Sequence, residues 1–113
     1  MTQAVTVPVI TPTELKTRLD AGDVPLLVDV REYHEADIAD LPDHGQVRIP
    51  TGEFPERYKE LDRGRELVIY CRSGRRSDWA ARILLQNGYE RVFNLKGGVL
   101  GWRNEVDPDL PAY

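Results

Sequence analysis

The sequence is poor in the residues that build metal centres and covalent cross-links. Its 113 residues include one cysteine and two histidines, His34 and His44. One cysteine cannot form an internal disulfide, and the spacing of the two histidines beside it matches no recognised zinc or iron site. We therefore expect no disulfide framework, no metal and no cofactor, and we assign neither histidine a function.

An excess of positive charge and long apolar runs are also missing. The formal net charge is −4, whereas nucleic acids and anionic membranes favour a basic face. No apolar run approaches the roughly 18 residues that span a bilayer. The start, MTQAVTVPVITP, lacks the basic and hydrophobic regions of a secretory signal. We expect no nucleic-acid or membrane partner, and a cytoplasmic location.

Length and composition favour a single domain. A chain of 113 residues with 41% hydrophobic content is large enough for one compact core. The sequence shows no internal repeat, linker or low-complexity tract. We expect one domain over residues 1–113, with a core over about residues 10–106.

Short apolar runs alternate with helical patterns along the chain. Buried strands are predicted at residues 26–30 and 67–71, a last strand at 92–95 and an edge strand at 46–49. Helices are predicted at 12–20, where Thr11-Pro12-Thr13-Glu14 forms a capping box, at 76–87, and over shorter stretches at 32–37, 54–60 and 100–106. Because the connections are too long for hairpins, the pattern predicts an α/β fold with a mainly parallel sheet and helices on both faces.

Two polar segments follow the buried strands. Asp29-Val30-Arg31 ends the first strand, and Cys71 ends the second. In open sheets of this kind, ligands bind at the carboxyl ends of the strands. We therefore expect the two segments to share one site.

The segment with the most chemistry is Cys71-Arg72-Ser73-Gly74-Arg75-Arg76-Ser77. It joins a strand to a helix, so its backbone N–H groups can turn inward while the helix dipole adds positive character. Three arginines within five residues add to this potential, and such surroundings favour a thiolate. Gly74 suits a tight turn in which a backbone amide either approaches the bound atom closely or adopts a positive φ angle. A lone cysteine after a strand is commonly a packing residue, but packing does not require this arginine cluster, so we interpret Cys71 as a nucleophile.

The same loop resembles the active-site loop of rhodanese-like domains. Leu27-Val28-Asp29-Val30-Arg31-Glu32 resembles the N-terminal signature of that family, and Asn94-Leu95-Lys96-Gly97-Gly98-Val99-Leu100-Gly101-Trp102 is similar to its closing strand, double-glycine turn and helix. The resemblance extends from about Ile10 onward. It implies the rhodanese fold and a single-domain sulfurtransferase of the thiosulfate type.

The resemblance also implies covalent sulfur transfer. A Cys71 thiolate would attack the outer sulfur of thiosulfate or a related donor, expel sulfite and hold the sulfur as a persulfide. A small thiol or a sulfur-carrier protein would then accept the sulfur. Substrate binding is expected from Arg72, Ser73, Gly74, Arg75, Arg76 and Ser77, with the three arginines on the sulfonate group. Asp29 and Arg31 would either brace the loop, as the resemblance implies, or form only a structural ion pair.

Two further stretches, residues 36–45 and the ending from Trp102, bear on the shape of the pocket and on a possible partner protein. Ala36-Asp37-Ile38 stands where the family commonly has Gly-His-Ile, and residues 39–45 look lengthened, so one wall of the pocket is expected to differ. The ending from Trp102 to Tyr113 resembles the tails of rhodanese domains fused to adenylyltransferases that thiolate small sulfur-carrier proteins. This sequence has no glycine-rich nucleotide loop, so such a partner would act in trans.

Three other functions compete with sulfur transfer. A dual-specificity phosphatase or an arsenate reductase would need the longer Cys-x5-Arg loop, whereas four residues separate Cys71 from Arg76 here and Ser77 occupies the required position. A non-catalytic binding module usually lacks the cysteine. An oxidation sensor would use the same activated thiolate, and persulfide turnover distinguishes it from an enzyme.

Overall fold

The computed structural model describes residues 6–113 and contains a five-stranded, all-parallel sheet. Its strands are β1 (Val9–Ile10), β2 (Leu26–Asp29), β3 (Val47–Arg48), β4 (Leu67–Tyr70) and β5 (Val92–Leu95), in the order β1-β5-β4-β2-β3. The predicted α/β fold with a parallel sheet is confirmed. The prediction about a secretory signal falls partly on residues 1–5, which lie outside the described residues.

Strand β1 is not predicted by the sequence pattern. Its two residues are too few to show the alternation that marks a strand. Hydrogen bonds from β5 define it instead: the backbone N–H groups of Asn94 and Lys96 donate to the carbonyl oxygens of Pro8 and Ile10, each at 2.9 Å. An edge strand formed by partners far along the chain leaves little trace in local sequence.

The helices largely follow the predicted ranges. They are α1 (Pro12–Asp20), α2 (Glu35–Ile38), α3 (Phe54–Arg57), the 3-10 helix η1 (Tyr58–Glu60), α4 (Arg75–Gln86) and α5 (Gly98–Glu105). The capping box starts α1 as predicted, because the N–H of Glu14 donates to the Thr11 hydroxyl at 3.1 Å and the N–H of Thr11 donates to the Glu14 carboxylate at 2.9 Å. Within residues 6–113, no helix has the length and apolar character needed to cross a membrane.

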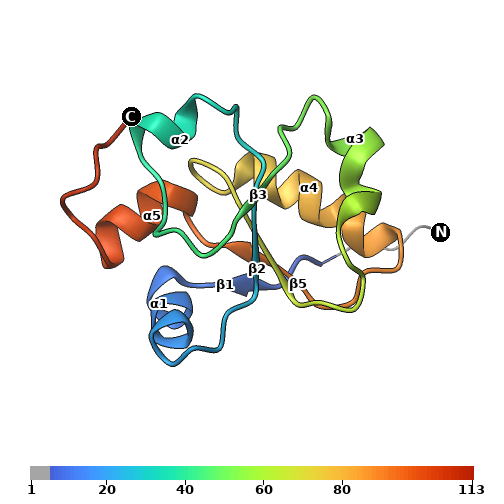
Figure 1. Cartoon of the computed structure of the whole chain (residues 1–113), viewed down its shortest axis with the longest axis horizontal. Coiled ribbons are helices and arrows are strands. Elements are labelled where there is room, and N and C mark those ends of the chain that lie inside the picture. Colours follow the sequence, from blue (N-terminus) through green and yellow to red (C-terminus); the bar gives the residue numbers. More distant parts are fainter. Residues whose placement is uncertain (1–5) are drawn as a thin grey trace.

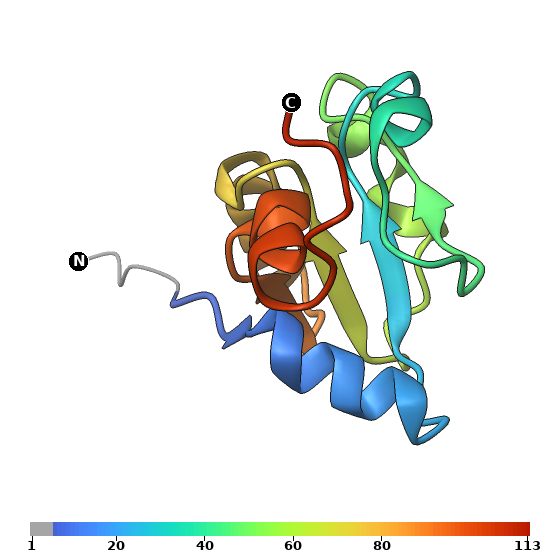
Figure 2. The ribbon, with the colours of Figure 1, turned by 90° about the vertical axis from the view of Figure 1, so that its left-hand side faces the viewer.

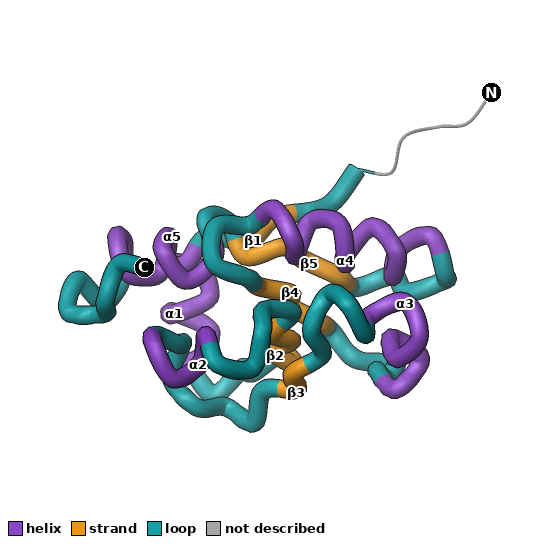
Figure 3. Tube along the Cα trace, turned by 90° about the horizontal axis from the view of Figure 1, so that it is seen from above, coloured by secondary structure: helices purple, strands orange, loops and turns teal. Residues whose placement is uncertain are grey.

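Helices cover both faces of the sheet (Figures 1 and 3), as the sequence predicts. Helices α3 and α4 pack on one face and α1 and α5 on the other. Side chains of successive strand residues alternate between the two cores: Val28 joins the cluster of Phe54, whereas Leu27 joins the cluster of Trp102. The central strands consist mainly of apolar residues because both faces are buried.

The carboxyl ends of β2 and β4 lie side by side, since Asp29 pairs with Tyr70 in the sheet. Figure 2 shows the loops that follow these strands and the end of the chain on the same side of the molecule, with α1 at the opposite side. The two polar segments expected to share one site therefore leave the sheet at neighbouring points.

A double-glycine turn between β5 and α5 supports the cysteine loop from behind. The backbone N–H groups of Val99 and Leu100 donate to the carbonyl oxygens of Cys71 and Arg72 at 2.9 and 3.0 Å. Gly98 has a φ of 59°, and a Cβ at this position would overlap the Cys71 carbonyl oxygen. Helix α5 begins at Gly98, two residues earlier than predicted, because its first N–H groups find partners in this loop.

We expect Gly98→Ala to be much more damaging than Gly22→Ala. Both glycines have a positive φ, but a Cβ on Gly22 would meet no atom within 4 Å. Gly22→Ala should therefore cost about 1 kcal/mol of unfolding free energy from backbone strain alone. Gly98→Ala should cost about 3 kcal/mol or more, because the loop must also move. Urea unfolding measures both values, and equal losses would contradict the proposed contact.

Candidate active site

Cys71 follows β4 directly, and the next loop encloses its sulfur. The residue is only 1% exposed. Its Sγ accepts hydrogen bonds from the backbone N–H groups of Gly74 at 3.1 Å and Ser77 at 3.4 Å. Neutral backbone N–H groups that converge on one atom stabilise negative charge on that atom.

Gly74 lets the chain reverse direction between β4 and α4. Its φ is 101°, and it caps the amino end of α4. The carbonyl oxygen of Gly74 accepts from the N–H of Asp78 at 3.2 Å, while its own N–H points to the sulfur. Of the two reasons for glycine that the sequence suggests, the positive φ is observed, and it places the first turn of α4, with its partial positive charge, beside Cys71.

Ser77 and Asn94 form a buried polar pair next to the sulfur. Ser77 Oγ lies 3.3 Å from Cys71 Sγ and 2.6 Å from Asn94 Oδ1. Asn94 Nδ2 donates to the Gly74 carbonyl oxygen at 3.0 Å. Sequence analysis placed Asn94 only within a family motif and gave it no function. A single amide inside the apolar strand Val92–Leu95 is the signal that points to it, because buried polar groups need a partner.

The three arginines of the loop have different surroundings. Arg76 forms a two-pronged ion pair with Glu35, at 2.7 and 2.9 Å. Arg72 lies over the ring of Tyr113, 5.3 Å from its centroid, and its Nε donates to the Tyr113 backbone oxygen. Arg75 is exposed, and its side chain makes no hydrogen bond or ion pair with any of residues 6–113. Of the three, Arg75 therefore has the charge that is freest to meet an incoming anion.

Glu35 is a member of the site that sequence analysis missed. Hydrogen bonds from Arg76 lower its pKa to about 2, against the opposing effect of burial, and the backbone N–H of Glu32 and the hydroxyl of Tyr113 assist. The pair also raises the pKa of Arg76. A glutamate in a short, charged, predicted helix resembles a solvent-facing residue, so the sequence carried no signal for this pair.

Tyr113 connects the site to the end of the chain. Arg31 Nη1 donates to the Tyr113 hydroxyl at 2.7 Å, and this hydroxyl donates to Glu35 at 3.0 Å. Figure 1 shows the last residues beside α2. Burial raises the pKa of Tyr113, although the hydrogen bond from Arg31 opposes this. The tail therefore forms one side of the site as well as closing the core.

Arg31 and Asp29 are buried and bound mainly to each other. Arg31 Nε and Nη2 donate to the two carboxylate oxygens of Asp29, both at 2.9 Å. Arg31 Nη1 also donates to the Ala39 carbonyl oxygen at 2.8 Å. Neither side chain makes a hydrogen bond with residues 71–77. Any support that the pair gives to the loop passes through Tyr113 or through Glu35, whose carbonyl oxygen accepts from Arg31 Nη1 at 3.3 Å, and is therefore indirect.

The lengthened stretch after α2 contributes a second carboxylate to this cluster. Asp40 accepts from Arg31 Nη2 at 3.0 Å, from Arg48 Nη2 at 2.6 Å and from the Tyr70 hydroxyl at 2.7 Å. Arg48 also pairs with Asp29 at 2.5 Å. Burial raises the pKa of Tyr70, and the charges of Asp29 and Asp40 raise it further. The altered wall of the pocket is therefore held by a network of ion pairs and hydrogen bonds among Asp29, Arg31, Asp40, Arg48 and Tyr70.

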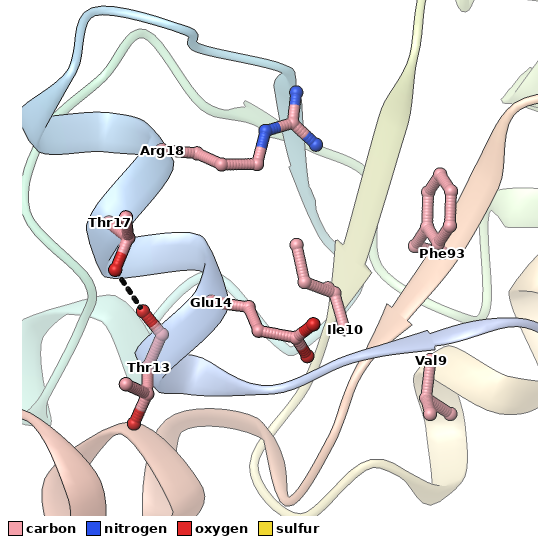
Figure 4. A pocket seen from close by; sticks show the side chains of 7 residues that line it. All are labelled: Val9, Ile10, Thr13, Glu14, Thr17, Arg18 and Phe93. Atoms are coloured by element: carbon pink, nitrogen blue, oxygen red, sulfur yellow. Dashed lines mark hydrogen bonds between the residues drawn. The ribbon is translucent and has the colours of Figure 1, made fainter.

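A cavity of about 460 Å³ lies away from this loop (Figure 4). Residues of β1 and α1 line it together with Phe93 of β5, and no residue of the segment 71–77 takes part. Its lining combines apolar side chains with two threonines, Glu14 and Arg18, and it includes no cysteine. We place the candidate active site at Cys71.

The fold and the loop together define a class of protein: a parallel α/β domain that presents one cysteine in an anion-stabilising turn between strand and helix. The family profile of the Rhodanese-like domain matches residues 11–105. This chain therefore belongs to the rhodanese-like family, as the sequence resemblance implies.

Relatives from several organisms agree with this assignment. A protein of Allochromatium vinosum named as a sulfurtransferase is 45% identical over 83 residues, covering 74% of this chain and 75% of that protein. The "Adenylyltransferase and sulfurtransferase MOCS3-2" of Zea mays is 36% identical over 112 residues. A crystal structure of a rhodanese-like domain protein from Staphylococcus aureus has a TM-score of 0.77 at 27% identity, over 95% of this chain and 99% of that one.

The relatives differ in length. The match with the maize protein includes 92% of this chain but only 23% of the maize protein. It spans 55% of YrkF from Bacillus subtilis, which is 36% identical over 104 residues. The predicted likeness to rhodanese domains joined to adenylyltransferases is confirmed by the maize relative.

The Glu35–Arg76 pair predicts a pH-dependent contribution to stability. The folded-state pKa of Glu35, about 2, lies below its usual value of 4.5, so the stabilisation is complete above pH 4.5 and declines as the pH falls toward 2. Glu35→Gln should lower the unfolding free energy by about 2 kcal/mol at neutral pH. The deficit should shrink in acid, because wild type then loses the same charge.

Urea unfolding of wild type and Glu35→Gln between pH 7 and pH 3 measures this. Glu32→Gln is the matched control, because Glu32 is an exposed glutamate close by in the chain. It should show a small and constant difference. A deficit for Glu35→Gln that stays constant with pH would contradict the assigned ion pair.

Proposed function

We propose that this protein is a rhodanese-type sulfurtransferase that carries sulfur as a persulfide on Cys71. The observation that supports this most directly is the enclosed Cys71 sulfur, which faces the backbone N–H groups of Gly74 and Ser77 at the start of α4. Membership of the rhodanese-like family and the sulfurtransferase name of the Allochromatium relative agree with it. The free cysteine suits a reducing compartment, and we propose the cytoplasm.

In the first half-reaction, the Cys71 thiolate attacks the outer sulfur of thiosulfate or a related donor. A lone pair on Sγ forms the new S–S bond while the bond from the outer sulfur to the sulfonate sulfur breaks. Sulfite leaves with the electron pair of that bond. The N–H groups around Sγ stabilise the attacking thiolate, and no oxidant or reductant is required.

In the second half-reaction, a nucleophile attacks the terminal sulfur of the persulfide. The S–S bond breaks and its electron pair returns to Sγ as a thiolate. Cys71 is 1% exposed, but an S–S bond of about 2 Å holds the transferable atom farther out than Sγ. The exposed residues Arg72, Ser73 and Arg75 belong to the same short segment after Cys71. A persulfide thus brings sulfur from an enclosed nucleophile to an acceptor outside.

The arginines divide the binding of the donor. We assign the sulfonate group first to Arg75, whose charge is not paired with a described residue, and second to Arg72, which Tyr113 holds in place. Arg76 contributes positive potential but is bound by Glu35. Ser73 and Gly74 complete the loop around the donor.

A small thiol or a sulfur-carrier protein is the proposed acceptor. The maize relative combines an adenylyltransferase with a sulfurtransferase in its name, and the tail of the present chain resembles that group. This supports an acceptor of the sulfur-carrier class, with an adenylating partner acting in trans.

Cys71→Ser should abolish sulfur uptake and leave the fold intact. The serine oxygen is a far weaker nucleophile, and the two residues have nearly the same shape. Intact-mass measurement after thiosulfate treatment should show one added sulfur atom on wild type and none on the variant, and cyanide should remove it as thiocyanate. Uptake by the variant would exclude Cys71 as the nucleophile. A wild type that oxidises without taking up sulfur would favour an oxidation sensor.

Arg75→Gln should raise the KM for thiosulfate about tenfold, because one charge-assisted contact with the donor is lost. Its unfolding free energy should remain that of wild type, since the side chain is exposed and bound to none of residues 6–113. Arg65→Gln is the matched control: it removes the same charge at the amino end of β4. Steady-state kinetics of both variants test the assignment, and equal KM values for the two variants would contradict it.

A further inference from the structure

We propose that Asn94 is a positioning residue that controls the sulfur of Cys71 through the hydroxyl of Ser77. In this arrangement the Ser77 hydroxyl has two positions, one on Asn94 and one on the sulfur. The inference deepens the proposed function, because it assigns a step of the sulfur-transfer cycle to each position.

The orientation of the Asn94 amide follows from its partners. The Gly74 carbonyl oxygen can only accept a hydrogen bond, and it lies 3.0 Å from Nδ2. The nitrogen must therefore face Gly74, which leaves Oδ1 toward Ser77 at 2.6 Å. Since Oδ1 can only accept, the single hydroxyl hydrogen of Ser77 points at Asn94.

This hydroxyl position fits a neutral thiol. With its hydrogen on Asn94, Ser77 Oγ turns only lone pairs toward Cys71 Sγ, 3.3 Å away. A thiol satisfies this geometry by donating S–H to Oγ. The result is a chain of two hydrogen bonds that runs from the sulfur through Ser77 to Asn94, entirely among residues that are 6% exposed or less.

A thiolate requires the other position. The charged sulfur has no hydrogen, so it would face the lone pairs of Oγ at close range. Rotation of the hydroxyl gives the sulfur a third donor besides the N–H groups of Gly74 and Ser77, at the cost of the bond to Asn94. Asn94 and the thiolate therefore compete for one hydrogen.

The competition matters most when the persulfide is discharged. Before attack, Sγ is bonded to the second sulfur and carries little charge, and the hydroxyl can stay on Asn94. When the acceptor takes the outer sulfur, the electron pair of the S–S bond returns to Sγ. The hydroxyl then turns to the sulfur and stabilises the leaving thiolate.

The charged and titratable groups around the sulfur are the same in wild type and in variants at positions 77 and 94. Arg72, Arg75 and Arg76 belong to the loop and α4, and Glu35 of α2 pairs with Arg76. Asp78 lies in the first turn of α4. On the remaining sides, β4 contributes Tyr70, β5 contributes no ionisable side chain, and α5 carries Arg103 and Glu105 in its last turns. Substitutions at positions 77 and 94 leave all of these in place.

The pH dependence of Cys71 alkylation by iodoacetamide tests the switch. The chain has one cysteine, so intact mass reports this reaction alone. Ser77→Ala removes the third donor and should move the midpoint of the profile to higher pH by about one unit. Asn94→Ala releases the hydroxyl to the sulfur and should move it to lower pH. The double variant should match Ser77→Ala, because Asn94 acts through Ser77.

Single-turnover measurements then separate the two half-reactions. Ser77→Ala should slow transfer of the persulfide sulfur to cyanide about tenfold. At a pH above the alkylation midpoints of all variants, the same substitution should have a smaller effect on the uptake of sulfur from thiosulfate. Asn94→Val serves as a second variant that fills the strand position if Asn94→Ala fails to fold. Asn87→Ala is the matched control at the far end of α4, where the amide donates to the Ile83 carbonyl oxygen.

The outcomes are distinct. Opposite shifts of the two single variants, together with a double variant whose midpoint matches that of Ser77→Ala, support the switch. Shifts in the same direction, or effects of the two substitutions that simply add, would overturn it and leave Asn94 as a clamp on Gly74 alone. If wild type takes up no sulfur while the opposite alkylation shifts remain, the proposed function fails but the hydroxyl switch stands.

Discussion

The site depends on the contact between the cysteine loop and the start of α5. Two backbone N–H groups of α5 bind the carbonyl oxygens of Cys71 and Arg72, and the contact is so close that position 98 tolerates no side chain. With its carbonyl groups fixed from behind, the loop directs N–H groups of its other side at the sulfur. Different peptide units of one short loop thus serve packing and chemistry, so the first turn of α5 supports the loop that encloses the Cys71 sulfur.

A second constraint is the buried guanidinium of Arg31. Its side chain is fully enclosed, and desolvation would strongly disfavour its charge if no partners surrounded it. Asp29 and Asp40 provide partners from nearby in the sequence, and Tyr113 provides one from far along the chain. Removing either carboxylate weakens the charge compensation of the buried guanidinium, and removing Tyr113 takes away one of its hydrogen-bond acceptors. The arginine therefore ties the lengthened pocket wall and the tail to the end of β2, which would otherwise be free to move relative to the loop.

The sequence predicts what local pattern encodes. Apolar runs gave β2 and β4, the capping box gave α1, and the seven residues from Cys71 to Ser77 gave the loop with its tight turn at Gly74. It does not predict β1, whose definition lies in hydrogen bonds from β5, nor the pairs that join Glu35 to Arg76 and Tyr113 to Arg31. These contacts connect residues that are far apart along the chain and ordinary in their local context. Asn94 is an intermediate case: the sequence shows a polar residue in an apolar strand, but it does not show which residue that side chain contacts.

Pairing also explains how an acidic protein can bind an anion. The net charge of −4 gives no general attraction, so positive potential must be local. Glu35 neutralises Arg76, and Tyr113 restrains Arg72, which leaves Arg75 exposed at the mouth of the loop. Near the sulfur itself, neutral N–H groups and a hydroxyl replace full charges. A fixed cation in contact with Sγ would stabilise the thiolate so strongly that the thiolate would become a weaker nucleophile. Backbone dipoles, and a hydroxyl that can rotate away, stabilise the sulfur only while it carries the negative charge.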